Sequence, residues 1–419
     1  MMIIFKLAAK SAWNRKVSLS LAMLSIAISI LLLLGVDQIR KQAKASFINT
    51  ITQTDLIVGA RSGSINLLLY SVFRIGNATN NISYQSYQEL AALPVVKWTI
   101  PISLGDSHRG FRVMGTNQDY FRYYRYADNQ SLRFQQGHMF DDIYDAVIGW
   151  DVAQSLHYQL QQDIVLTHGL MPTQFNQHLD KPFRVVGILK PTGTAIDRTI
   201  HVSLQGIEAI HVDWQAGTQS PIHITAQQAR HMNLEPKAIT AFMLGLERKI
   251  DTFSLQRKIN QYKAEPLLAI LPGATLARLW QTIGQFERIL FMISGLVLIA
   301  GLIGLLTTLL TTLNERRREM AILRAIGAHA YHILLLFLLE ALLVVMGGCL
   351  FGIGLLYSLQ SMIQPWIVEW YGIQFSVSPL DSEQGLILLI AIGLAMLLSL
   401  IPGWIAYQHS LQDGLTVKV

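Results

Sequence analysis

The 419-residue sequence is poor in cysteine and in charge, and each shortage narrows what the protein can be. Its single cysteine, Cys349, lies within a long apolar run, so no internal disulfide can support the rest of the chain. Charged residues make up only 14% of the sequence, whereas 51% is hydrophobic and the mean hydropathy is +0.36. This composition excludes an ordinary soluble protein, and it is too polar for a transporter built entirely of membrane helices.

Several sequence motifs of enzymes and metal proteins are missing as well. Without a G-x-x-x-x-G-K-[ST] phosphate loop, the chain is not expected to bind ATP itself. It also has no H-E-x-x-H, C-x-x-C or G-x-S-x-G motif, so we predict no catalytic residues, no metal ligands and no cofactor. The sequence therefore indicates a protein that is not an enzyme.

Histidine is nevertheless frequent in one part of the chain. Nine of the twelve histidines lie between residues 37 and 288, among them His201, His211, His223 and His231. Their spacings of 8–12 residues do not place them on one helix face, and a zinc site needs three or four converging ligands. We therefore predict that these histidines are surface residues.

Four apolar runs are long enough to cross the hydrocarbon core of a membrane, which takes ~20 helical residues. The first run is interpreted as a retained helix. It is longer than the apolar core of a signal peptide, and no small-residue cleavage site follows it. The four predicted spans are residues 17–36, 289–313, 333–357 and 385–407.

Lysine and arginine in the short flanking segments predict the orientation of the chain. Residues 1–16 carry four of them, and so does the connector 314–332, whereas segment 358–384 has none and contains three acidic residues. By the positive-inside rule both termini and the connector face the cytoplasm, while 37–288 and 358–384 lie outside. Since this topology accounts for most of the net charge of +6, no nucleic-acid partner is predicted.

The long segment between the first two spans predicts a mixed α/β domain. Runs rich in β-branched and aromatic residues predict strands, and helical patterns lie between them, the last with Asp251 at its N-cap. The predicted strands are 55–58, 95–103, 111–114, 164–167 and 183–189, and the predicted helices are 84–93, 151–156 and 251–262. The fold class is thus an α+β membrane protein, with one span before and three spans after a large extracytoplasmic mixed α/β domain.

Composition divides the chain further. Residues 1–16 predict an amphipathic helix at the inner interface, and 408–419 form a tail. Polar, helix-favouring segments predict stalks at 37–49 and 274–288. The outer domain is predicted to consist of one unit from 50–124 and 236–273, and of an inserted subdomain, 125–235.

The connector after the second span has the pattern of a short amphipathic helix. In NERRREMAILRAIGA, residues 314–328, the apolar side chains cluster on one arc and Arg317 and Arg324 share another. Such a helix is either a positive-inside anchor or a docking surface for a cytoplasmic partner. The pattern alone leaves both interpretations open.

Glu340 is the only acidic or basic residue in the four predicted spans. A carboxylate at that depth can be functional, can pair with a neighbouring helix or can extend toward the interface. Its role is therefore left open by the sequence.

A turn in the inserted subdomain is a candidate functional loop. Asp197 and Arg198 follow it and are predicted to form a local ion pair that orders the loop. The residues of this turn are Pro191, Thr192, Gly193 and Thr194.

The layout and the connector together resemble a known family. A basic amphipathic helix, one span, a large outer domain and three more spans are the layout of MacB/FtsX-like (type VII) ABC permeases. The lipoprotein-releasing proteins LolC and LolE share this layout, without a fused ATPase. The segment NERRREMAILRAIGA and the following LLLFLLEALLVVMGGCLFGIGL are similar to that family's entry into its third span.

The resemblance implies that the connector is a coupling helix that docks on a separate cytoplasmic ATPase. That ATPase, rather than this chain, would bind ATP and magnesium. The residues that the resemblance assigns to coupling are Glu315, Arg316, Arg317, Arg318, Glu319, Leu323, Arg324 and Gly327.

The resemblance further implies a non-catalytic permease subunit in a bacterial inner membrane, paired with a second copy and an ATPase dimer. ATP hydrolysis would move the periplasmic domain, a mode called mechanotransmission, to extract or export a lipoprotein, lipid or other lipophilic substrate. Partners would include membrane lipid and a periplasmic protein or lipoprotein. The alternatives are an FtsX-type regulator of a periplasmic enzyme and a component of a zinc acquisition system.

Overall fold

The computed structural model describes residues 16–48, 50–127, 129–169, 178–215, 218–219, 224–315, 322, 327–371 and 379–412. Two compact units emerge from the contacts within the chain. The helical unit comprises residues 1–42, 283–366 and 375–419, and the sheet unit comprises 43–282 and 367–374.

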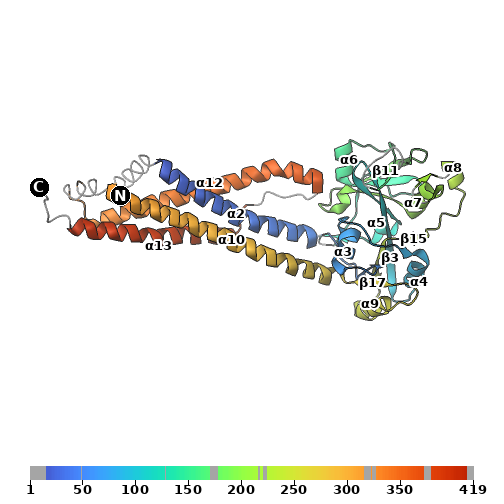
Figure 1. Ribbon diagram of the computed structural model, residues 1–419. Coiled ribbons are helices and arrows are strands. Elements are labelled where there is room, and N and C mark those ends of the chain that lie inside the picture. The colour runs from blue at the N-terminus through green and yellow to red at the C-terminus, as the bar shows by residue number, and fades with distance from the viewer. Residues whose placement is uncertain are drawn as a thin grey trace. The chain divides into compact units, whose positions relative to one another are not determined.

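Four long helices dominate the described residues (Figure 1). At 1.5 Å per residue they are roughly 45–65 Å long, well beyond the ~30 Å hydrocarbon core. All four contain a stretch that is apolar and long enough to span a membrane, which confirms the predicted one-plus-three arrangement. They are α2 (Lys16–Ile48), α10 (Pro272–Glu315), α12 (Ala330–Tyr371) and α13 (Ser382–Gln412).

Helix α2 is the centre of the helical unit. Its Ile26, Ile30 and Leu34 are fully buried in one apolar cluster to which all four helices contribute. On α10 and α13, by contrast, large apolar side chains such as Leu296 and Leu389 are more than half exposed. Lipid tails would cover such side chains in a membrane.

Helices α2 and α10 continue beyond the predicted spans. Helix α2 extends to Ile48 and α10 begins at Pro272, so both predicted stalks are helical over the described residues. Helix α12 likewise continues to Tyr371, well into the segment predicted as the loop 358–384. Apolar length fixes where a helix can cross the membrane, but it does not fix where the helix ends.

The sheet unit is built on an 11-stranded sheet whose main path is β17-β1-β16-β3-β4-β12-β8-β11-β7. Most pairs are antiparallel, but β12 is parallel to β4 and β11 is parallel to β8. The strands of this path are β1 (Leu56–Ala60), β3 (Val96–His108), β4 (Phe111–Thr116), β7 (Phe134–Gly137), β8 (Asp145–Ile148), β11 (Phe183–Leu189), β12 (Thr199–Ser203), β16 (Ala241–Leu246) and β17 (Leu267–Ile270).

Shorter strands complete this unit. Strand β10 pairs with β3 and β9 pairs with β11, while three two-stranded pairs lie apart. The bounds are β2 (Ile82–Ser83), β5 (Arg125–Tyr126), β6 (Gln130–Ser131), β9 (Asp163–Ile164), β10 (Thr167–His168), β13 (Trp214–Gln215), β14 (Thr218–Gln219) and β15 (Ala238–Ile239).

Short helices pack on the sheet and close three apolar cores. One core contains Leu276 from the first turns of α10, so this helix is part of the sheet unit at its start. The remaining helices are α3 (Ser64–Val72), α4 (Tyr84–Ala91), α5 (Asp119–Tyr123), α6 (Trp150–Leu156), α7 (Leu204–His211), α8 (Ala226–Ala229) and α9 (Thr252–Asn260), with 3-10 turns η1 (Ala195–Arg198) and η2 (Lys249–Asp251).

In this unit one local prediction is wrong, and another is confirmed in position only. The predicted strand 164–167 is two short strands, because the chain leaves β11 after Ile164 and pairs with β3 from Thr167. Asp251 does stand at the N-cap of α9, but its side chain makes no capping hydrogen bond. Its carboxylate pairs with Arg248 instead, at 3.0 Å from Nε to Oδ2.

Candidate functional site

The predicted coupling segment is described only at its two ends and at Ile322. Helix α10 ends at Glu315, and Gly327 has φ +97°, a conformation that favours glycine, shortly before α12 begins at Ala330. Between them only Ile322 is described, as a helical residue that is 56% exposed. The predicted residues that lie outside the described part are Arg316, Arg317, Arg318, Glu319, Leu323 and Arg324.

Glu340 lies inside the bundle. Its side chain is on α12 and only 1% exposed, between the fully buried Phe337 and Ala341. Extension of this carboxylate to the membrane interface is therefore excluded.

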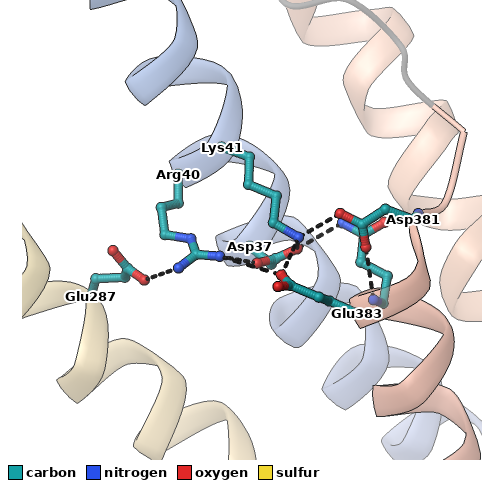
Figure 2. A network of polar contacts seen from close by, with 7 residues as sticks. Asp37, Arg40, Lys41, Glu287, Asp381 and Glu383 are labelled. Atoms are coloured by element: carbon teal, nitrogen blue, oxygen red, sulfur yellow. Dashed lines mark hydrogen bonds and ion pairs between the residues drawn. The ribbon is translucent and has the colours of Figure 1, made fainter. Parts of the chain in front are cut away.

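A polar network at one end of the bundle was not predicted as a site (Figure 2). Its centre is Asp37 on α2, whose side chain is only 8% exposed. The Asp37 carboxylate accepts hydrogen bonds from Arg40 at 2.8 Å and from the Gln384 amide of α13 at 2.9 Å, and Lys41 lies 3.0 Å away. A carboxylate so buried is stabilised only because it has these partners.

Other residues of the same stretch of α2 reach the remaining helices. Arg40 pairs with Glu287 of α10 at 3.1 Å, and Gln38 accepts a hydrogen bond from Gln360 of α12. One helix thus contacts the other three through polar side chains at this level. If one of the four helices is displaced, these polar contacts must either break or move the other helices with it.

Lys41 ties α2 to the start of α13. Its ammonium lies 2.7 Å from Glu383 and donates to Asp381, the residue just before α13 (Figure 2). This hydrogen bond holds the pKa of the Asp381 carboxyl below its ordinary value. Asp381 also accepts from the backbone N–H of Gln384 at 2.8 Å, which fixes the first turn of α13.

The sequence does contain a signal for this network. Basic residues at 40 and 41 lie a few residues after the first apolar run, and acidic residues at 381 and 383 lie just before the last one. In the sequence alone, those acidic residues indicate the orientation of the chain. Opposite charges at the same end of two spans would also have indicated a cross-helix contact.

Glycines on α12 allow this helix to approach α2 closely. A Cβ atom at Gly352 would lie 2.7 Å from the carbonyl oxygen of Ala27, and one at Gly348 would lie 2.8 Å from Cγ2 of Ile26. Two small residues four apart on one face are a recurrent means of packing membrane helices. The pair positions α2, and with it the polar network, against α12.

The predicted loop in the inserted subdomain is ordered by Asp197. Its carboxylate, on a residue only 1% exposed, accepts hydrogen bonds from the backbone N–H groups of Thr192 at 2.9 Å and Gly193 at 2.7 Å. Burial, partly opposed by these hydrogen bonds, raises the pKa of Asp197 to about 6. Arg198 lies over the ring of Phe111 at 4.9 Å. The loop therefore has a structural explanation that needs no ligand.

We predicted that the histidines of this segment lie on the surface, but only some of them do. His231 is exposed, whereas His201 is fully buried against Tyr120, with ring centroids 5.1 Å apart. The surface prediction is therefore wrong for His201, and also for the buried His108 and His178. His211 is partly buried and close to two other polar side chains, and His223 lies outside the described residues.

Comparisons with known proteins agree with this architecture. The family model of the MacB-like periplasmic core domain matches residues 19–261, more than half of the chain. The model of the FtsX-like permease C-terminal domain matches residues 291–413. The two matches together include at least part of each of the four apolar helices and most of the sheet unit.

Curated relatives share the same parts at low identity. The macrolide export ATP-binding/permease protein MacB of Nitrosomonas europaea is 24% identical over 85% of this chain and 51% of its own length. The pyoverdine export ATP-binding/permease protein PvdT of Pseudomonas aeruginosa is 24% identical over 65% of this chain and 39% of its own length. The chain thus spans about half the length, or less, of these two relatives.

Among solved structures, the periplasmic region of MacB from Actinobacillus actinomycetemcomitans covers 57% of this chain, with a TM-score of 0.34 and 11% identity. The extracellular domain of the transporter YknZ from Gram-positive bacteria covers 51%, with a TM-score of 0.31 and 13% identity.

Proposed function

Because the chain belongs to the family of MacB-like and FtsX-like permeases, we propose that it is the membrane subunit of an ABC complex driven by a separate ATPase. In this proposal the ATPase dimer binds ATP and magnesium in the cytoplasm. Two copies of this chain sit in the inner membrane with both termini inside. Hydrolysis moves the sheet unit on the outer side.

The continuity of α10 carries this proposal. This single helix of 44 residues begins in the sheet unit, where Leu276 is buried in the core, and ends at Glu315, where the predicted coupling segment starts. An uninterrupted helix is stiff along its axis, roughly 65 Å here at 1.5 Å per residue. We propose that a push at its cytoplasmic end is passed along this helix toward the sheet unit.

The apolar interior of the bundle favours transmission of motion over passage of a polar substrate between the helices. The described interior is mostly apolar, with Ile26, Leu302 and Val345 among its buried residues. We propose that the substrate is lipophilic, a lipid, a lipoprotein or a hydrophobic small molecule, and that it is handled on the outer side. Relatives named for export of macrolides and of pyoverdine are compatible with this class.

Charge reversal in the coupling segment tests the proposal. The variants Glu315→Lys, Arg317→Glu and Arg324→Glu are expected to lower co-purification with the ATPase, or the ATPase activity of the complex, by at least ~10-fold. Such an effect corresponds to a loss of about 1.4 kcal/mol in docking, which one charge-assisted hydrogen bond can supply. Co-purification and ATP turnover of the reconstituted complex measure it.

The matched control for these variants is Arg257→Glu, at an exposed position of α9 in the sheet unit. It reverses the same charge and should leave both measurements unchanged. The chain without an ATPase is expected to hydrolyse no ATP, which sets the baseline. Normal co-purification and turnover in all three coupling variants would show that the connector is only a topological anchor.

Labelling of introduced cysteines tests the proposed orientation. In a Cys349→Ala background, single cysteines replace Ser220 in the sheet unit, Ser378 before α13 and Ser410 near the C-terminus. An impermeant thiol reagent applied to intact spheroplasts is expected to react with the first two and not with the third. The reverse pattern would place the arginine-rich connector outside and would rule out ATPase docking there.

A further inference from the structure

Three potential metal ligands converge in the sheet unit, far from the coupling segment in the sequence. Asp106 is on β3, His168 is on β10 and His211 is the last residue of α7. His168 is directly opposite Asp106 in the antiparallel β10–β3 pair, so their side chains are on the same face of the sheet. One ligand atom from each residue lies within 4.8 Å of those from the other two.

The distances between these atoms suit a tetrahedral ion. Oδ1 of Asp106 is 3.1 Å from Nδ1 of His168 and 3.5 Å from Nε2 of His211. A tetrahedral zinc site with bonds of about 2.0–2.1 Å has ligand atoms about 3.3 Å apart. These two separations bracket that value, and all three ligand atoms lie within 4.8 Å of one another, so adjustment of the side chains can bring them to one ion.

His211 is oriented as a metal ligand usually is. Its Nδ1 lies 2.8 Å from the carbonyl oxygen of Ile207, which can only accept, so Nδ1 carries the proton and donates. In the neutral ring the lone pair then lies on Nε2, on the side of Asp106, where an ion between the two groups would meet it. This nitrogen is buried, and its contact with Oδ1 of Asp106, at 3.5 Å, is too long for a good hydrogen bond. A backbone carbonyl holding the second ring nitrogen is the common support of a zinc-bound histidine.

A fourth histidine lies beside the cluster. His178 is fully buried, and its ring centroid is 5.1 Å from that of His211. Neither of its ring nitrogens has a hydrogen-bond partner among the described residues. Unsatisfied buried nitrogens are costly in a folded protein, and an ion or its bound water next to the ring would satisfy one of them.

We propose that Asp106, His168 and His211 form a binding site for a divalent transition-metal ion, and that this ion is zinc. Two imidazole nitrogens and one carboxylate oxygen are a borderline donor set, which binds zinc well and calcium or magnesium poorly. Three protein ligands leave one coordination position for water, for His178 after a side-chain rotation, or for a group of the bound substrate. The site goes beyond the proposed transport function and does not depend on it.

Calorimetry on the full-length chain tests the site. The protein, purified in detergent without a polyhistidine tag and stripped of metal with a chelator, is titrated with Zn²⁺. We expect one zinc per chain and a loss of affinity of at least ~100-fold in His168→Ala and in His211→Ala. His231→Ala is the matched control, because it removes an exposed histidine of the same unit and should bind zinc like the parent protein.

A spectroscopic measurement separates this site from adventitious binding. Co²⁺ in a tetrahedral N/O site has a strong visible absorption, which should appear in the parent chain and in His231→Ala and vanish in His168→Ala. The His168 side chain is 53% exposed, so its removal should not unfold the domain even if other substitutions do. If the parent chain does not bind zinc, or if His168→Ala and His231→Ala bind it with equal affinity, the proposal is wrong. The cluster is then only an ion pair of one carboxylate with two histidines.

Discussion

Replacing Asp37 by alanine is expected to destabilise the helical unit by about 3 kcal/mol and to abolish coupling to the ATPase. The Asp37 carboxylate is 8% exposed and accepts or faces three donors, from Arg40, Lys41 and Gln384. Removing it leaves the amide of Gln384, on a residue only 2% exposed, without its acceptor. It also leaves two cations close together with less negative charge between them.

The measurement is thermal unfolding of the full-length chain in detergent, followed by ATP turnover of the reconstituted complex. Glu383→Ala is the matched control. Glu383 belongs to the same network and lies 2.7 Å from Lys41, but its side chain is 70% exposed. An exposed ion pair contributes less than about 1 kcal/mol to stability. This variant should therefore have nearly the melting temperature of the parent chain, and its complex should have nearly the same ATP turnover.

Two results would contradict this account. If Asp37→Ala and Glu383→Ala have the same melting temperature, burial of the Asp37 carboxylate does not contribute to stability, and the network acts like a set of exposed ion pairs. If Asp37→Ala is destabilised but still couples fully, the network holds the helices together without transmitting motion between them.

The spans were predictable because an apolar run is a local property of the sequence. Each predicted span lies inside one of the four long helices, and strands with β-branched and aromatic residues, such as β3 and β11, were also recognised. Strand β16, Ala241–Leu246, was not predicted. All six of its residues are buried, so the alternation that identifies a half-exposed strand is absent.

The polar network and the histidine cluster were beyond sequence reasoning for another reason. Asp37 and Gln384 are 347 residues apart, and Asp106 and His168 are 62 apart. Their proximity depends on helix packing in one case and on the register of β10 against β3 in the other. A one-residue shift of that register would place His168 on the opposite face of the sheet.

Replacing Gly352 by leucine is expected to separate α2 from α12 and to be the most destabilising substitution at a helix contact. A Cβ atom there would lie 2.7 Å from the carbonyl oxygen and 3.2 Å from Cα of Ala27. These are backbone atoms, which cannot rotate away as a side chain can, so the whole of α2 has to move. Overpacking of this kind costs about 3 kcal/mol, and close backbone packing between the two helices is lost as well.

Gly354 provides a control on the same helix with the same substitution. A Cβ atom at Gly354 has no neighbour within 4 Å among the described residues, so Gly354→Leu should be tolerated and should gain helix propensity of up to about 1 kcal/mol. Thermal unfolding and size-exclusion chromatography of both full-length variants in detergent measure the difference. Since α2 also carries Asp37, Arg40 and Lys41, Gly352→Leu should lose ATPase coupling as well, whereas Gly354→Leu should retain it. Equal melting temperatures for the two variants would mean that α2 does not pack on α12 through this glycine.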